Sequence, residues 1–136
     1  MRILIDTNVF LDFLQRREPY LQDAISIMEL AHKNIVEGVI AAHSISNMFY
    51  ILRKDYSIEK RKQLIRAISD VFPIIPINKE IIQKALDDDM DDFEDAIQYE
   101  CAVFAKVDYI VTRNVSDYIN TSIRAITPKD FLQIEK

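Results

Sequence analysis

The feature that most constrains the fold is a short apolar run followed at once by polar residues, close to the start of the chain. Ile3, Leu4 and Ile5 are rich in β-branched side chains, which is typical of a strand buried on both faces of a parallel sheet. The next segment, Asp6-Thr7-Asn8, favours a helix N-cap, and apolar side chains then recur at helical spacing. The sequence therefore predicts a strand, a tight turn and a helix, with the Asp6 carboxylate at the carboxyl end of the strand.

Asp6 has two interpretations at this point. Ligands of open α/β sheets bind at the carboxyl ends of the strands, so a carboxylate there is a candidate site residue. A carboxylate that only caps the following helix would need no other role. The first stretch alone does not distinguish them.

Strands alternate with helices along the whole sequence. Further apolar runs predict strands at residues 36–41, 71–77, 109–112 and 123–126, in addition to 2–6. The segments between them predict helices at 7–16, 20–34, 44–54, from 57, 78–86, up to about 106, and from 127. Ser44 or Ser46, Ser57, Asn78 and Thr127 are the expected helix caps. This alternation predicts a parallel sheet with right-handed crossovers and helices on both faces. The prolines in 71–77 place that strand at an edge, and residues 1–136 are expected to form one domain.

The composition excludes several kinds of site. A single glycine argues against a phosphate-binding glycine-rich loop, and Cys101, the one cysteine, allows no intramolecular disulfide. His32 and His43 are far apart in sequence, which argues against a zinc site. No apolar stretch is long enough for a membrane span and none resembles a signal peptide, so a soluble, cytoplasmic protein is expected.

The net charge of −5 and the pI of about 5.0 argue against nucleic-acid binding through a broad basic surface. They remain compatible with an acidic site that meets phosphates through bound cations. The basic clusters Arg53-Lys54 and Lys60-Arg61-Lys62 are the candidates for direct phosphate contacts, and one of the tyrosines is a candidate for stacking on a base.

An acidic segment is the second informative stretch. It holds seven carboxylates within nine residues: Asp87, Asp88, Asp89, Asp91, Asp92, Glu94 and Asp95. Carboxylates in a first helical turn complement the helix dipole, but so many like charges repel one another, and a bound cation relieves that repulsion. We therefore expect at least one of Asp92 and Asp95 to be functional, and Asp87 to Asp89 to form a solvated loop. On the helix that follows, Phe93, Ile97, Cys101 and Phe104 are expected to pack on the sheet.

Two further polar stretches follow predicted strands. Thr112-Arg113-Asn114-Val115-Ser116-Asp117 comes after the fourth strand, and Ser44-Ile45-Ser46-Asn47 comes after the second. Each has a simpler interpretation, as an Asx-type turn and as a helix cap, and His43 is expected to be a capping or surface group. If they meet Asp6 in one crevice, the carboxylates and amides together form the hard oxygen ligands that Mg²⁺ or Mn²⁺ prefers.

The chain resembles bacterial PIN domains through four motifs that occur in the family's order across essentially its whole length. These are Ile3-Leu-Ile-Asp6-Thr-Asn8-Val, Ser44-x-Ser-Asn47, Asp92-Phe-Glu-Asp95-Ala, and Ile-Val-Thr112-Arg113-Asn114-x-x-Asp117. The resemblance implies a three-layer α/β/α sandwich around a central, mostly parallel sheet of about five strands. It implies a metal-dependent ribonuclease, and kinship with the toxins of Vap-type toxin–antitoxin pairs, which commonly form homodimers and bind a small antitoxin.

The resemblance also implies roles for individual residues. Asp6, Asp92, Asp95 and Asp117 correspond to catalytic and metal-binding positions, and Thr7, Asn8, Thr112 and Asn114 to supporting ones. Either Asn114 or Asp117 can face the metal in the last motif. Asn47 is the departure, because many PIN nucleases have a glutamate there, although one branch has asparagine. An amide oxygen can ligate a hard cation, but it carries no charge and takes no proton.

Two functions are compatible with these residues. The first is an Mg²⁺- or Mn²⁺-dependent endoribonuclease that hydrolyses single-stranded RNA, with an RNA substrate and no membrane partner. The second is a catalytically weakened PIN-like module that binds RNA or a protein without cleavage. A phosphoaspartate protein fits poorly. A receiver domain needs paired acidic residues at the end of its first strand, and a haloacid-dehalogenase-type phosphatase needs Asp-x-Asp there, whereas this chain has Asp6-Thr7-Asn8.

Overall fold

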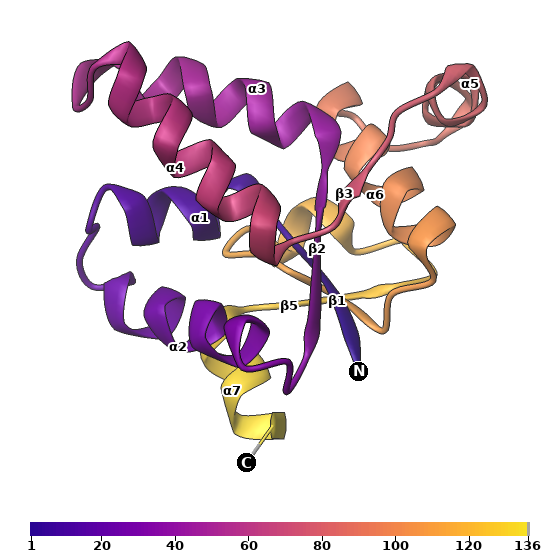
Figure 1. The fold of residues 1–136 in the computed structure, drawn as a ribbon. Helices are drawn as coiled ribbons and strands as arrows, with labels where there is room; N and C mark the ends of the chain where they lie inside the picture. The colour runs from indigo at the N-terminus through magenta and orange to yellow at the C-terminus, as the bar shows by residue number, and fades with distance from the viewer. Residues whose placement is uncertain (136) are drawn as a thin grey trace.

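A five-stranded parallel sheet organises residues 1–135, the part of the chain that the computed structural model describes (Figure 1). Its strands are β1 (Arg2–Ile5), β2 (Glu37–Ala41), β3 (Ile74–Ile75), β4 (Tyr109–Val111) and β5 (Arg124–Ile126). Their order in the sheet is β3-β2-β1-β4-β5, and every ladder is parallel. The α/β class expected from the alternation of strands and helices is confirmed.

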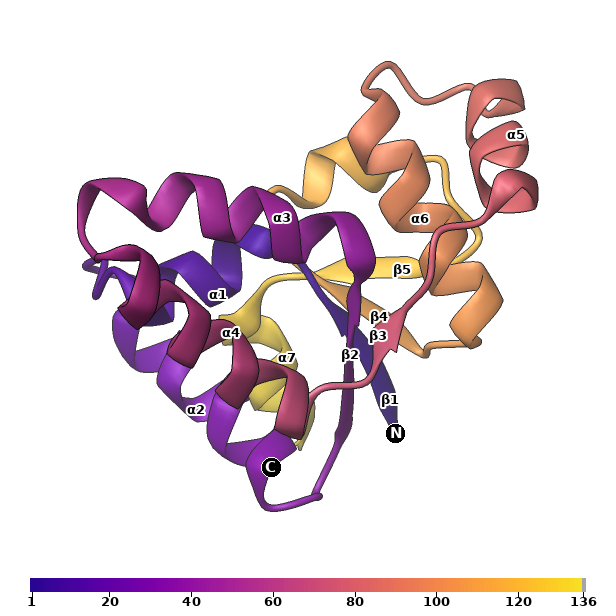
Figure 2. The same cartoon turned by 45° about the horizontal axis from the view of Figure 1, so that its top comes forward.

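Helices cover both faces of the sheet and form a three-layer sandwich (Figure 2). The helices are α1 (Thr7–Leu14), α2 (Leu21–His32), α3 (Ala42–Ile51), α4 (Ile58–Val71), α5 (Lys79–Asp87), α6 (Phe93–Ala105) and α7 (Pro128–Glu135). Short 3-10 helices η1 (Leu52–Lys54) and η2 (Val115–Tyr118) follow α3 and β4. α5 and α6 lie on one face, and α1, α2, α3, α4 and α7 on the other. Among residues 1–135 no helix combines the length and the apolar character that crossing a membrane requires.

The first strand contributes side chains to two hydrophobic cores, one on each face of the sheet. Ile3 and Ile5 pack among the side chains under α1, α2 and α4, whereas Leu4 packs among those under α6. All three side chains are fully buried, as the apolar run predicted. Alternate residues of a strand point to opposite faces, so β1 anchors both helical layers.

The strand order reverses at β1. The chain adds β2 and β3 on one side of β1 and then places β4 and β5 on the other side. Backbone pairing continues one residue beyond β1, where the Asp6 amide donates to the Val111 carbonyl at 3.0 Å. Asp6 and Thr112 therefore emerge side by side from adjacent strands, at the kind of switch point where α/β proteins bind ligands.

Three predicted helix caps are confirmed. Ser57 accepts a hydrogen bond from the Lys60 amide at 3.2 Å, and Asn78 accepts one from the Ile81 amide at 2.9 Å. The Thr127 hydroxyl accepts one from the Asp130 amide at 3.1 Å, and Pro128 is the first residue of α7. Each cap satisfies a backbone donor that the first turn leaves without a partner.

Three expectations about element positions are wrong. β3 has two residues instead of seven, because α4 continues to Val71 and because Pro73 and Pro76, which lack an amide hydrogen, stand on either side of it; β3 does lie at the sheet edge. α3 begins at Ala42, so neither Ser44 nor Ser46 is its cap. Phe93 and Phe104 are exposed, while Ile97 and Cys101 are buried. The reason is that the buried face of α6 is centred on small side chains that allow close approach to the sheet: Ala96, Cys101, Ala102 and Ala105.

The only glycine of the chain marks a close approach between β2 and the helical layer. A Cβ on Gly38 would lie 2.9 Å from Cε1 of Phe72 and 3.1 Å from Cδ1 of Ile5. The Phe72 ring is fixed by an edge-to-face contact with Phe10, with centroids 5.0 Å apart, so it has little room to move. Any larger residue at position 38 must displace this packing.

We expect Gly38→Ala to lower the free energy of unfolding by about 1–3 kcal/mol, because the added methyl group overpacks the core. Urea denaturation followed by circular dichroism measures the change. Glu37→Ala is the control: Glu37 lies on the same strand, but its ion pair with Arg2 is exposed, so we expect a loss below about 1 kcal/mol. An equal loss in both variants would contradict the packing explanation.

Candidate functional site

The polar stretches singled out in the sequence meet in a cavity of about 390 Å³ beyond the carboxyl end of β1. We call it the central cavity. Its polar and aromatic lining residues are Asp6, Thr7 and Asn8 from the β1–α1 turn, His43, Asn47 and Tyr50 from α3, Glu94, Asp95 and Gln98 from α6, and Asn114 after β4. The structure thus brings together all the predicted site residues except Asp92, Thr112 and Asp117, which lie beside it.

Asp6 is held by donors from three parts of the chain. The Thr112 hydroxyl donates to Oδ2 at 2.6 Å, the Asn8 amide donates to the same oxygen at 3.3 Å, and the Gln98 amide donates to Oδ1 at 2.8 Å. Asp6 stands at the N-cap position of α1, but its side chain makes no capping hydrogen bond to the helix, so capping alone does not explain the carboxylate. Burial raises the pKa of Asp6, and the bond from Thr112 acts in the opposite direction.

Asp95 connects the central cavity to a second, larger one. This acidic cavity, of about 690 Å³, is lined by seven carboxylates, those of Asp87, Asp88, Asp89, Asp91, Asp92, Asp95 and Asp117. Burial raises the pKa of Asp95 to about 6, helped by the nearby carboxylates of Asp92, Asp117 and Asp6. The Tyr118 hydroxyl donates to Oδ1 of Asp95 at 3.4 Å.

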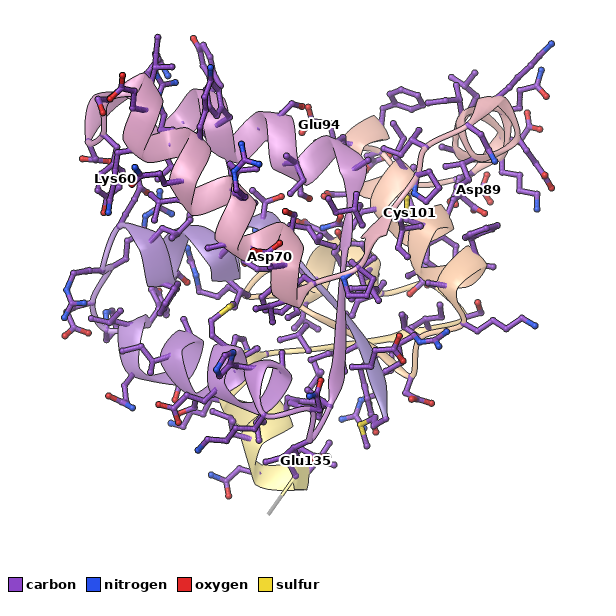
Figure 3. All side chains as sticks on the ribbon, in the orientation of Figure 1. Lys60, Asp70, Asp89, Glu94, Cys101 and Glu135 are labelled. Carbon is purple, nitrogen blue, oxygen red and sulfur yellow. The ribbon has the colours of Figure 1, made fainter. Side chains whose placement is uncertain are left out.

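The other acidic residues divide between structural and site positions. Asp92 caps α6, since its Oδ1 accepts the Asp95 amide hydrogen at 3.0 Å. Asp117 lies in η2 and close enough to Asp6 and Asp95 to raise the pKa of both. Asp87 to Asp89 lead from the end of α5 into a largely exposed loop, as expected. Figure 3 shows Asp89 beside α5 and Glu94 near α3, so the acidic segment runs from one side of the molecule to the central cavity.

A chain of hydrogen bonds from Thr7 through Ser44 and Gln98 leads to Asp6. The Thr7 hydroxyl donates to Ser44 Oγ at 2.7 Å, and the Ser44 hydroxyl donates to Gln98 Oε1 at 3.4 Å. This orients the Gln98 amide so that its NH₂ group faces Asp6. Thr112 in turn accepts the Asn114 amide hydrogen at 3.0 Å, which fixes the start of the last motif.

Sequence reasoning missed Gln98 and misplaced His43. Gln98 is buried in an otherwise apolar stretch of α6, three residues after Asp95 and therefore on its face, which was the available signal. His43 was expected to be a capping or surface group, but it is half-buried in the first turn of α3, which begins at Ala42, and it lines the central cavity. Burial lowers the pKa of His43, while the nearby Glu94 acts in the opposite direction.

A buried ion pair fastens the last motif to α1. Arg113 donates to both oxygens of Asp12, from Nε at 2.7 Å and from Nη2 at 3.1 Å, and Arg17 Nη1 lies 3.8 Å from the same carboxylate. Asp12 is only 1% exposed. It is the one charged residue in the otherwise largely apolar sequence of α1, a pattern from which its buried ion pair could have been predicted. The pair fixes the loop that carries Thr112 and Asn114.

The donor set fits a hard divalent cation that keeps water ligands. Among residues 1–135, no three Asp, Glu, His or Cys side chains lie close enough together to hold a metal ion by themselves. Mg²⁺, however, is usually bound by one or two carboxylates together with waters and substrate phosphates. Asp6 and Asp95 supply those carboxylates, their mutual repulsion favours a cation, and the buried Oδ1 of Asn8 has no hydrogen-bond donor within the described residues.

Comparison with known proteins shows the family and the fold. A family model described as PIN domain matches residues 2–116. Similar solved structures include VapBC2 from Rickettsia felis bound to a promoter DNA fragment (TM-score 0.69, 14% identity, covering 93% of this chain and 98% of that one). A toxin–antitoxin complex from Klebsiella pneumoniae has a TM-score of 0.70 and 21% identity, covering 93% and 97%. The structure of VapBC-1 from nontypeable Haemophilus influenzae has a TM-score of 0.67 and 11% sequence identity, covering 95% of this chain and 99% of that one. No curated protein matches the sequence.

We expect the Asp95 carboxyl group to titrate near pH 6 in metal-free buffer, because burial and the neighbouring carboxylates favour its protonated form. Carboxyl ¹³C chemical shifts measure this directly. Since the folded state binds this proton more tightly than the unfolded chain, stability should fall as the pH rises from about 4 to about 6. Asp95→Asn should therefore raise the melting temperature at pH 7 but not at pH 4. A pKa of Asp95 near its ordinary value would contradict the explanation by burial and neighbouring carboxylates.

Proposed function

Because the chain belongs to the PIN domain family, we propose that it is a metal-dependent endoribonuclease that hydrolyses single-stranded RNA. The observation that carries the proposal is the pair of carboxylates, Asp6 and Asp95, in one cavity where the strand order reverses. Burial raises the pKa of both groups and nearby carboxylates add to the shift, an arrangement that a bound cation would stabilise. PIN domain toxins are generally nucleases, which supports this assignment.

Four carboxylates have proposed roles at this site. Asp6 and Asp95 would hold Mg²⁺ or Mn²⁺, with Asp117 approaching from the acidic cavity and Asp92 from the start of α6. The ion would polarise the scissile phosphate and lower the pKa of a bound water. Asp117, which lies close to both Asp6 and Asp95, would orient the attacking water and accept its proton.

The neutral groups keep these carboxylates in position. Thr112 and Gln98 hold the two oxygens of Asp6, and Tyr118 donates to Asp95. Thr7 acts through Ser44, while Asn8 and Asn114 line the cavity where a substrate phosphate would lie. With both oxygens of Asp6 fixed in advance, little reorganisation is needed when the ion binds.

Asn47 supports a second candidate function. It lines the central cavity as a neutral amide, and it can hold a water or a cation but cannot take a proton. A site weakened in this way would bind RNA or a protein without cleaving RNA. The cleavage experiment below separates the two candidates.

We further propose that the protein is the toxin of a toxin–antitoxin pair, forms a homodimer and binds a small antitoxin. The support is the likeness of its fold to proteins solved as toxin–antitoxin complexes. Residues 1–136 would form a single PIN domain in that assembly.

We expect purified protein to cleave single-stranded RNA with Mg²⁺ or Mn²⁺, and cleavage to stop when a chelator is added. Asp6→Asn should slow cleavage by more than about 100-fold, because it removes a metal ligand rather than one of its supporting partners. Gel analysis of end-labelled RNA measures the rate. Asp70→Asn is the matched control, since Asp70 is an exposed residue of α4 that lines neither the central nor the acidic cavity, and it should leave the rate within about twofold.

Two results would contradict the ribonuclease proposal. Cleavage that persists unchanged in Asp6→Asn would place the activity elsewhere or in a contaminant. Absence of cleavage by folded wild-type protein with either metal would favour the binding module instead.

A further inference from the structure

Two tyrosines that each carry an arginine on one ring face lie along the cavities next to Asp6. The Arg53 guanidinium lies 3.8 Å from the ring centroid of Tyr50, and that of Arg113 lies 4.1 Å from the centroid of Tyr20. Both rings remain open to solvent, with Tyr50 62% exposed and Tyr20 41% exposed. An exposed ring paired with a cation is the arrangement on which nucleic-acid bases stack, whatever their identity.

The two tyrosines line adjoining cavities. Tyr50 lines the central cavity together with Asp6 and Asp95. Tyr20 lines a cavity of about 500 Å³, here called the lateral cavity, together with Arg113 and Lys129. Asn114 lines both, so the two cavities adjoin at this residue. A chain molecule bound at Asp6 can therefore extend from Tyr50 through Asn114 to Tyr20.

Charge distinguishes the two exits from the central cavity. The lateral cavity is lined by two cations, Arg113 and Lys129, and by one carboxylate, Asp23. Arg113 is also paired with the buried Asp12, so Lys129 is the cation of this lining that a phosphate can reach. The acidic cavity on the other side is lined by seven carboxylates and, within the described residues, by no cation. A phosphate backbone is attracted to the first and repelled by the second, so its path should lead to the lateral cavity.

Stacking on these tyrosines requires bases that are not already paired. In a duplex the bases stack on one another inside the helix, whereas in single strands they can turn outward onto aromatic side chains. The occupant with separated phosphates and free base faces is therefore a single strand.

We propose that the protein binds single-stranded RNA along this path, with one base stacked on Tyr50, a second on Tyr20, and a backbone phosphate at Lys129. The proposal rests on the ribonuclease function proposed above, whose substrate it orients. Arg53 and Arg113 strengthen the stacking by contributing positive charge behind each ring. The acidic cavity repels the phosphate backbone, so a strand bound at Asp6 and Asp95 should leave the central cavity through the lateral cavity.

Binding is tested in an Asp6→Asn background, so that RNA is not cleaved while its affinity is measured. Fluorescence anisotropy of a short labelled single-stranded RNA should show about tenfold weaker binding for Tyr50→Ala and for Tyr20→Ala. Tyr50→Phe and Tyr20→Phe should restore binding, because they keep the ring. Phe104→Ala, which removes an exposed ring on α6 outside the path, is the matched control and should bind as the background protein does.

Two further readouts report stacking and charge separately. A 2-aminopurine base in the RNA should lose fluorescence on binding, and lose less in each Tyr→Ala variant. Lys129→Gln should reduce the slope of log affinity against log salt concentration by about 0.7, as expected for one phosphate contact to a single strand. Lys79→Gln, an exposed lysine at the start of α5 that lines neither cavity of the path, should leave the slope unchanged.

The outcomes separate this path from the ribonuclease proposal. RNA affinity unchanged in both Tyr→Ala variants, or no RNA binding by the folded protein, overturns the path. Duplex RNA bound as tightly as single-stranded RNA also overturns it. Binding that depends on both tyrosines, combined with no cleavage by the wild type, supports the path and overturns the ribonuclease instead.

Discussion

The site depends on the burial of one carboxylate, Asp6, at the point where the sheet changes direction. An ionised carboxylate taken out of water is costly unless hydrogen-bond donors replace the water it loses. Here the donors come from the β1–α1 turn, from the residue after β4, and from α6, so the three elements must be in place together. The geometry of the site therefore depends on the folded sheet and on the docking of α6.

Asp95 adds the second part of that constraint. It reaches the central cavity from the first turn of α6, and nearby carboxylates raise its pKa along with burial. Natural proteins retain such repulsion mainly at functional sites, where a bound ion or a transferred proton relieves it. In the Asp12–Arg113 ion pair, by contrast, both carboxylate oxygens of Asp12 accept hydrogen bonds from Arg113. The pair ties the last motif to α1.

Much of this arrangement could be predicted from sequence because it depends on local patterns. The apolar run 3–5, the caps at Ser57 and Asn78 and the alternation of strands with helices are set within a few residues each. The parts that were wrong depend on contacts between distant segments. The exposure of Phe104 follows from which face of α6 fits the sheet, and the position of His43 follows from where α3 begins. Gln98 was missed because its partner Asp6 is 92 positions away in the chain.

We infer that the carboxylates around Asp6 hold a divalent cation. Isothermal titration of Mn²⁺ into wild-type protein and Asp6→Asn, side by side in the same buffer, tests it most directly. We expect measurable binding by the wild type that is lost in the variant, because Asp6 is the carboxylate that Thr112 and Gln98 hold in the central cavity. Equal binding by both proteins, or no binding by folded wild-type protein, would contradict it.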